Sequence, residues 1–139
     1  VRRMHEAKVS GNPEVVIWGS GLPRREFIYS QDLADACVYL IDRYDESEPI
    51  NIGVGRDWSI RELAENVKEV VGYAGALKFD TSKPDGMPAK LLDSSRLQEM
   101  GWTANFSLRD GLMETYQWYL RYLHHLALAA GGGDVRADL

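Results

Sequence analysis

The sequence predicts an α/β fold whose strands pair in a parallel or mixed arrangement. Short segments rich in β-branched and aromatic residues alternate with longer segments whose apolar residues recur at helical spacing. Serines followed three positions later by a carboxylate mark the start of two of the helices. The chain has 139 residues, which is enough for one domain with a substantial core but not for two full domains.

In the first part of the chain, strands are predicted at residues 14–18 (EVVIW) and 26–29 (EFIY). They follow a basic segment, residues 2–8, that is typical of the last turns of a helix. Ser30 is expected to cap the next helix, with Asp32 in its first turn. The apolar face of that helix should dock on a sheet and consists of Leu33, Cys37, Leu40, Ile41 and Tyr44.

The middle of the chain predicts a strand at residues 49–54 (PINIGV) and then a well-defined helix. Ser59 and Glu62 form a capping box at its start, and Gly72 ends it. Its buried stripe is expected to be Ile60, Leu63, Val67 and Val70.

In the last part, a strand at residues 77–80 leads into a Pro/Gly loop at residues 82–88 (SKPDGMP), and a short helix runs from Ser95 to Gly101. Ser107 with Asp110 opens the final helix. The residues expected to face inward from it are Leu108, Leu112, Tyr116, Tyr119, Leu120 and Leu123. Residues 127–139 are predicted to be a disordered tail, which leaves residues 1–126 as the folded domain.

The net charge and the cysteine content exclude several classes of binding partner and site. The net charge of −5 gives no general electrostatic reason to bind nucleic acid or an anionic membrane, so any anion site must be local. Cys37 is the only cysteine, which excludes an intrachain disulfide and a Cys-based zinc site, and we expect it to pack in the interior. No segment resembles a membrane span or a signal peptide. We therefore expect a cytoplasmic protein without nucleic-acid or membrane partners.

The stretch WGSGLPRREFIY, residues 18–29, suggests three kinds of structure: a cofactor-binding glycine loop, a plain turn or an anion clamp. A dinucleotide fingerprint has three glycines and opens a helix, whereas here Arg24 holds the third position and a strand is expected to follow. A Walker-type loop is excluded because the sequence has no Gly-Lys-Ser/Thr. A turn and a clamp both remain possible.

The clamp hypothesis depends on one arginine and one tryptophan. If residues 24–29 alternate as a strand, Arg25 shares a face with Phe27 and Tyr29, where its planar guanidinium suits a phosphate. Trp18 is either a core residue or the cover of a base or sugar. The loop at residues 82–90 is either a solvated connection or a rigid loop that presents Lys83 or Lys90 to an anion.

Several segments resemble the GDP-L-fucose synthases, a family of extended short-chain dehydrogenase/reductases within the NAD-dependent epimerase/dehydratases. These segments are WGSGLPRREFIYSQDLADA, INIGVG with SIRELA, FDTSKPDGMPAKLLDSSRL, and MGW with TYQWYL. The first and third are the specific ones, because R-x-F, N-x-G and G-W occur broadly among extended reductases. The chain is similar to the carboxy-terminal substrate domain of that family from Arg2 to about Leu123.

The resemblance implies a set of substrate-binding residues. In the family the GDP moiety lies between the cofactor domain and this smaller domain. The residues implied to contact it are Arg3, Trp18, Arg25, Asp85 and Lys90. The resemblance further implies a homodimeric full-length enzyme that epimerises GDP-4-keto-6-deoxy-D-mannose at C3 and C5 and reduces C4 with NADPH.

The catalytic part of that family has no counterpart in this sequence. The Rossmann cofactor domain that binds NADP(H) is absent, no Tyr-x-x-x-Lys occurs, and neither Cys37 nor any histidine matches a catalytic residue. We therefore expect this chain alone to hold a GDP-sugar, to carry no catalytic residue and no metal, and to be inactive. Two alternatives stay open: the substrate domain of another nucleotide-sugar enzyme, and a stand-alone binding module.

Overall fold

The structure is a computed structural model and describes residues 1–129. It is an α/β fold, as the sequence predicts, and its strands form two small sheets. The elements in chain order are α1 (Arg2–Ser10), β1 (Glu14–Trp18), β2 (Arg24–Glu26), α2 (Ser30–Ile41), β3 (Asp57–Ser59), α3 (Ile60–Val71), β4 (Ala76–Asp80), β5 (Ala89–Lys90), α4 (Ser95–Glu99) and α5 (Leu108–Ala129).

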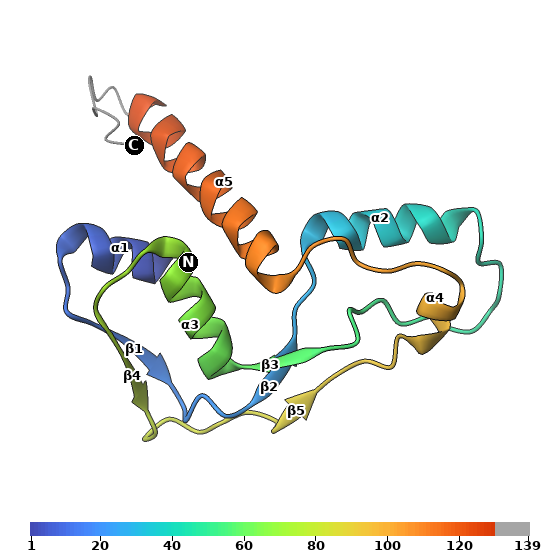
Figure 1. Cartoon of the computed structure of the whole chain (residues 1–139), viewed down its shortest axis with the longest axis horizontal. Helices are drawn as coiled ribbons and strands as arrows, with labels where there is room; N and C mark the ends of the chain where they lie inside the picture. The colour runs from blue at the N-terminus through green and yellow to red at the C-terminus, as the bar shows by residue number, and fades with distance from the viewer. Residues whose placement is uncertain (130–139) are drawn as a thin grey trace.

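The two sheets confirm the predicted mixed pairing. β1 and β4 are parallel neighbours, with Trp18 opposite Asp80 at the end of the pair. In the second sheet β2 is central, antiparallel to β3 and parallel to β5. Figure 1 shows the second sheet between the β1–β4 pair at one end of the molecule and helices α2 and α4 at the other. The chain from β1 to β2 therefore connects the two sheets.

A first core cluster gathers α1, α3, α5 and β1. Its members become buried because each helix turns one apolar stripe toward the others. They are Met4, Ala7, Val15, Ala64, Val67, Val71, Tyr73 and Tyr116. Gly72 ends α3 in the left-handed conformation, and Ser59 and Glu62 exchange both bonds of the predicted capping box.

A second, smaller cluster joins α2 to α4 and to the segment that follows α4. Ala36 and Leu97 are fully buried, and Trp102 is 4% exposed. Two carboxylates of α2 hold that segment. Asp32 is buried and accepts the backbone N–H groups of residues 105 and 106, each at 3.0 Å, and Asp35 accepts the indole N–H of Trp102 at 2.9 Å. This packing sets the position of α2.

The predicted face of α2 is wrong for three of its five residues, whereas Leu40 packs against the second cluster as predicted and Tyr44 is partly buried. Leu33 is 40% exposed, Ile41 is 77% exposed and Cys37 is exposed rather than packed in the interior. The buried side of the helix instead carries Asp32 and Ala36. Helical periodicity selects the larger apolar residues as the buried face. In the structure the small Ala36 packs against Leu97 instead, and the buried carboxylate of Asp32 accepts hydrogen bonds from backbone N–H groups. Tyr29, without a side-chain cap bond, holds the N-cap position that we expected Ser30 to hold.

Two strand predictions also need correction. β2 covers Arg24–Glu26 and not residues 26–29, and residues 49–54 form no strand. The carboxylate of Glu26 explains the second difference. It accepts the N–H groups of Val54 at 2.6 Å and Gly55 at 2.8 Å, so these donors are satisfied by a side chain rather than by a neighbouring strand.

The other predicted elements are confirmed, with the final helix longer than expected. Ser107 and Asp110 exchange hydrogen bonds at the start of α5, and Tyr116 is buried. α5 continues to Ala129, so residues 127–129, assigned above to the tail, are helical. The rest of the tail lies outside the described residues. Within residues 1–129 no helix combines the length and apolarity that a membrane crossing requires.

We predict that Asp32→Asn destabilises the fold by about 1 to 3 kcal/mol. An asparagine amide has one acceptor oxygen, and its NH₂ group would face a backbone N–H that now donates to the carboxylate. The measurement is urea unfolding at neutral pH. The matched control is Asp42→Asn, which removes the same charge from an exposed residue just after α2. Equal stabilities of the two variants would contradict the assigned role of Asp32.

Candidate functional site

The glycine turn after β1 is built by close approach of other residues. Gly19 and Gly21 have φ values of 85° and 80°, a region that L side chains rarely adopt. A Cβ at Gly19 would lie 2.4 Å from Oδ1 of Asp85, and a Cβ at Gly21 would lie 2.4 Å from the ring of Phe79. β2 follows the turn, which confirms that this is no dinucleotide fingerprint.

Asp85 ties the Pro/Gly loop to this turn. Its carboxylate accepts the Ser20 backbone N–H at 2.8 Å and the Ser20 hydroxyl at 2.6 Å, across 65 residues of sequence. These two hydrogen bonds stabilise the ionised form and hold the pKa of Asp85 below its ordinary value. The loop is thus fixed beside the turn by a charge-assisted contact.

The two adjacent arginines have different tasks. Arg24 forms ion pairs with Asp57 at 2.8 Å and with Glu62 at 3.4 Å, so it joins β2 to β3 and to the start of α3. Arg25 turns to the other side and donates from Nη1 to the carbonyl of Met87 at 2.8 Å. Arg25 is also the register partner of Lys90 in the parallel β2–β5 pair, which brings two cations side by side.

Trp18 is a surface residue. Its side chain is 72% exposed, which rules out the core role that the sequence left open. Nζ of Lys83 lies 5.8 Å from the centroid of its indole ring, within the range of a cation–π contact. An exposed indole beside cations can cover a flat, apolar part of a ligand.

Arg3 reaches the same strand from α1. Its guanidinium donates to the carbonyl of Val16, two residues before Trp18 on β1. The structure therefore places Trp18 and Arg25 at the two ends of the glycine turn, Asp85 in the Pro/Gly loop and Lys90 at its end in β5. Arg3 contacts β1 two residues before Trp18. We call residues 18–25 and 80–90 together the turn–loop surface.

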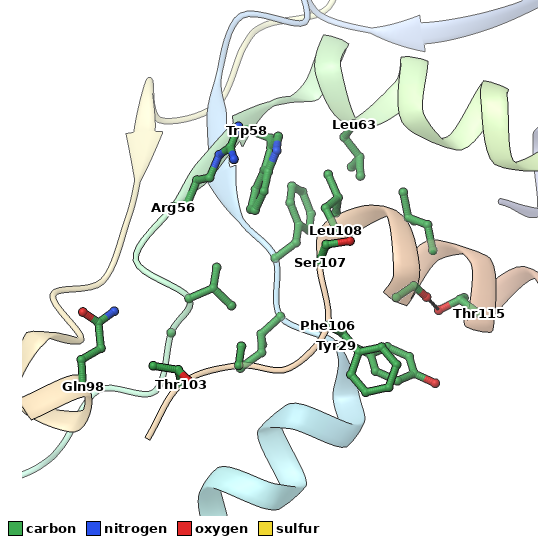
Figure 2. Close-up of a pocket in the computed structure, with 17 residues that line it drawn as sticks. Tyr29, Arg56, Trp58, Leu63, Gln98, Thr103, Phe106, Ser107, Leu108 and Thr115 are labelled. Atoms are coloured by element: carbon green, nitrogen blue, oxygen red, sulfur yellow. Dashed lines mark hydrogen bonds between the residues drawn. The ribbon is translucent and has the colours of Figure 1, made fainter. Parts of the chain in front are cut away.

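A second region of the molecule, separate from the turn–loop surface, is a cleft. A cleft of about 480 Å³ lies beyond the other end of β2, between the start of α5, the start of α2 and β3. Figure 2 shows Tyr29 beside Phe106, with ring centroids 4.7 Å apart, and Trp58 beside Arg56. None of the five residues implied by the resemblance lines this cleft.

The expectation that Arg25 shares a face with Phe27 and Tyr29 is wrong. Phe27 and Tyr29 line the cleft, but Arg25 does not, so this arginine does not sit with the two aromatics. The walls of the cleft come from five separate segments of the chain, so no pattern within one segment predicts it. One available signal was the aromatic character of residues 27–29 and of Trp58.

Charged and polar side chains are distributed differently over the cleft and the turn–loop surface. The cleft is lined by one charged side chain, Arg56, and by polar residues that include Tyr29 and Gln98. Within the part of the chain that the structure describes, no cluster of three or more His, Cys, Asp or Glu side chains could hold a metal ion. The turn–loop surface offers Arg25, Lys83 and Lys90 to an anion and Trp18 to a flat group.

Comparison with known proteins shows which proteins this chain is similar to. Residues 1–53 match the model of the NAD dependent epimerase/dehydratase family. Over 121 residues, 87% of this chain, it is 61% identical to GDP-L-fucose synthase 1 of Arabidopsis thaliana. It is 47% identical, over 86% of its length, to the GDP-L-fucose synthase of Escherichia coli. The match covers 38% of the first relative and 40% of the second, so the chain spans about two fifths of their length.

Among solved structures, this chain is similar to parts of two enzymes that are named for GDP-sugars. A GDP-L-fucose synthetase from Naegleria fowleri bound to NADP superposes with a TM-score of 0.82 at 29% identity, over 88% of this chain and 39% of that one. A GDP-mannoheptose C4 reductase from Campylobacter jejuni with NADP bound gives a TM-score of 0.76 at 40% identity, over 86% of this chain and 42% of that one. This chain therefore shares the fold of about two fifths of each of these two structures.

We predict that the contribution of Asp85 to stability disappears in acid. Because its folded-state pKa is lowered, the contribution is complete above the unfolded value near 3.8 and is lost as the pH falls through the folded value. The difference in free energy of unfolding between the wild type and Asp85→Asn should stay constant from about pH 7 to 5 and shrink below about pH 4. Urea unfolding at each pH measures it. A difference that does not change with pH would refute this assignment.

Proposed function

We propose that this chain is the carboxy-terminal, GDP-sugar-binding part of a GDP-L-fucose synthase. The observation that carries the proposal is the 61% identity over 121 residues to an Arabidopsis protein of that name. Within this chain, the structure joins the glycine turn to the Pro/Gly loop through Ser20 and Asp85. The binding domain is proposed to consist of residues 1–126.

Each proposed contact residue has a physical role that fits a nucleoside diphosphate. Arg25 and Lys90 lie side by side in register and supply two cations for the phosphates, and Arg3 adds a third along β1. Trp18 is exposed and covers the base or the ribose. Asp85 keeps a free lone pair on each oxygen after bonding Ser20, so it can still accept a ligand hydroxyl.

The chemistry of the whole enzyme is proposed to reside outside this chain. A GDP-L-fucose synthase epimerises GDP-4-keto-6-deoxy-D-mannose at C3 and C5 and then reduces C4, and NADPH supplies the hydride. We propose that a Rossmann domain in the remainder of the protein binds NADP(H) and carries the catalytic residues, and that the full enzyme is a cytoplasmic homodimer. The residues of this chain bind and orient the nucleotide end of the substrate.

The proposed preference for a GDP-sugar distinguishes this chain from related enzymes that act on other nucleotide sugars. The Campylobacter relative with a TM-score of 0.76 is also named for a GDP-sugar. A UDP-glucose 4-epimerase from Thermotoga maritima shares 28% identity with a TM-score of 0.74. The pattern of similarity therefore favours a GDP-sugar over a UDP-sugar.

We predict that the purified chain binds GDP more tightly than UDP or dTDP in isothermal titration. Arg25→Ala and Lys90→Ala should each weaken GDP binding by roughly tenfold or more, because a charge-assisted hydrogen bond to phosphate contributes about 1.5 to 3 kcal/mol. Equal affinities for the three nucleotides would favour another nucleotide-sugar enzyme. No GDP binding by a folded chain would favour a stand-alone module of another kind.

The matched control for these variants is Arg121→Ala. It removes one exposed positive charge from α5, away from the turn–loop surface. Its GDP affinity should equal that of the wild type. If Arg121→Ala weakens binding as much as Arg25→Ala does, the effect is one of net charge and the assigned contacts are wrong.

We further predict that residues 1–139 alone do not oxidise NADPH in the presence of GDP-4-keto-6-deoxy-D-mannose. The sequence has no Tyr-x-x-x-Lys pair and no dinucleotide fingerprint. The measurement is absorbance at the NADPH band, with a complete GDP-L-fucose synthase as positive control. Turnover by this chain would overturn the assignment of the chemistry to the remainder of the protein.

A further inference from the structure

Lys83 is a cation of the turn–loop surface that the resemblance does not include among its contact residues. Its ammonium lies 5.8 Å from the ring centroid of Trp18, and both side chains are exposed. In the described part of the chain Lys83 forms no ion pair, whereas Lys78, five residues earlier, pairs with Glu14. The ammonium of Lys83 can therefore contact an anion beside the exposed indole of Trp18, which can contact a flat ring.

The backbone under Lys83 is fixed on both sides. Before it, Asp80 accepts the Ser82 N–H at 3.0 Å and the Ser82 hydroxyl at 2.6 Å, and the Asp80 carbonyl accepts the Lys83 N–H at 3.2 Å. The same carbonyl accepts the Gly19 N–H at 2.9 Å, so the start of the loop is tied to the residue after Trp18. The position of Lys83 relative to Trp18 is therefore set by hydrogen bonds.

On the other side of Lys83, Pro84 has a fixed φ and Asp85 is bonded to Ser20. Beyond them, the Met87 carbonyl accepts from Arg25. The loop from residue 80 to 87 is held at both ends and in its middle. A lysine on such a segment loses less freedom on binding an anion than one on a loose loop, because its backbone is already ordered.

We propose that Lys83 binds a phosphate of the nucleotide diphosphate, while its contact with Trp18 keeps the ammonium beside the indole that covers the nucleoside. This inference rests on the proposed function and extends its binding site by one residue. The carboxylates nearest in the loop, Asp80 and Asp85, are bonded to Ser82 and Ser20. In this proposal Arg25, Lys90 and Lys83 share the phosphates from two segments of the chain, β2 and residues 80–90.

The test compares Lys83→Met with Lys78→Met by isothermal titration of the full chain with GDP. Both variants remove one exposed lysine charge, but only Lys83 lies beside Trp18. We expect Lys83→Met to weaken GDP binding about tenfold and Lys78→Met to leave it unchanged. Lys83→Arg should restore most of the affinity because it retains the charge.

A second ligand separates phosphate binding from a contact with the base. Guanosine, measured at millimolar concentration in the same titration or in competition with GDP, should bind the wild type and Lys83→Met equally well. GDP affinity that is unchanged in Lys83→Met, or lost equally in Lys78→Met, would overturn the role of Lys83 alone. A loss shared equally by guanosine would also overturn it. A wild-type chain that binds no GDP would overturn the proposed function, and with it this inference.

Discussion

The arrangement of the whole molecule depends on the three side chains of β2. Arg24 is ion-paired with Asp57 and Glu62, which holds β3 and the start of α3 against the strand. Arg25 holds the loop before β5 through the Met87 carbonyl. Glu26 accepts the N–H groups of residues 54, 55 and 92. Successive side chains of a strand point to opposite sides, so Arg25 points away from Arg24 and Glu26. The three residues together therefore contact parts of the chain that lie on both sides of β2.

The contact between Asp85 and Ser20 completes this arrangement at the turn–loop surface. A glycine turn by itself fixes no ligand site, because its residues have many conformations available. Here Asp85 and Phe79 approach Gly19 and Gly21 so closely that a side chain at either position would collide with them. The turn is rigid because residues about sixty positions away pack against it. The glycines permit this close approach, and a strand rather than a helix follows them.

What the sequence could predict follows from how local each interaction is. The capping box of Ser59 and Glu62 lies within one helical turn, and both of its hydrogen bonds were predicted correctly. The absence of a strand at residues 49–54 could not be read from that segment alone, because the N–H of Val54 donates to Glu26, a side chain 28 residues away. The buried face of α2 depends on Leu97 and on donors at residues 105 and 106, which helical periodicity does not contain.

The boundary of β2 decides which surface each residue of WGSGLPRREFIY serves. Had the strand continued to Tyr29, alternation would have placed Arg25, Phe27 and Tyr29 on one face. β2 ends at Glu26, and beyond it the chain leaves the sheet, so Phe27 and Tyr29 line the cleft in front of α5. Arg25 remains with Lys90 on the turn–loop surface. A shift of three residues in one strand thus separates a cationic surface from an aromatic cleft, and the proposed phosphate contacts Arg25 and Lys90 both lie on the cationic surface.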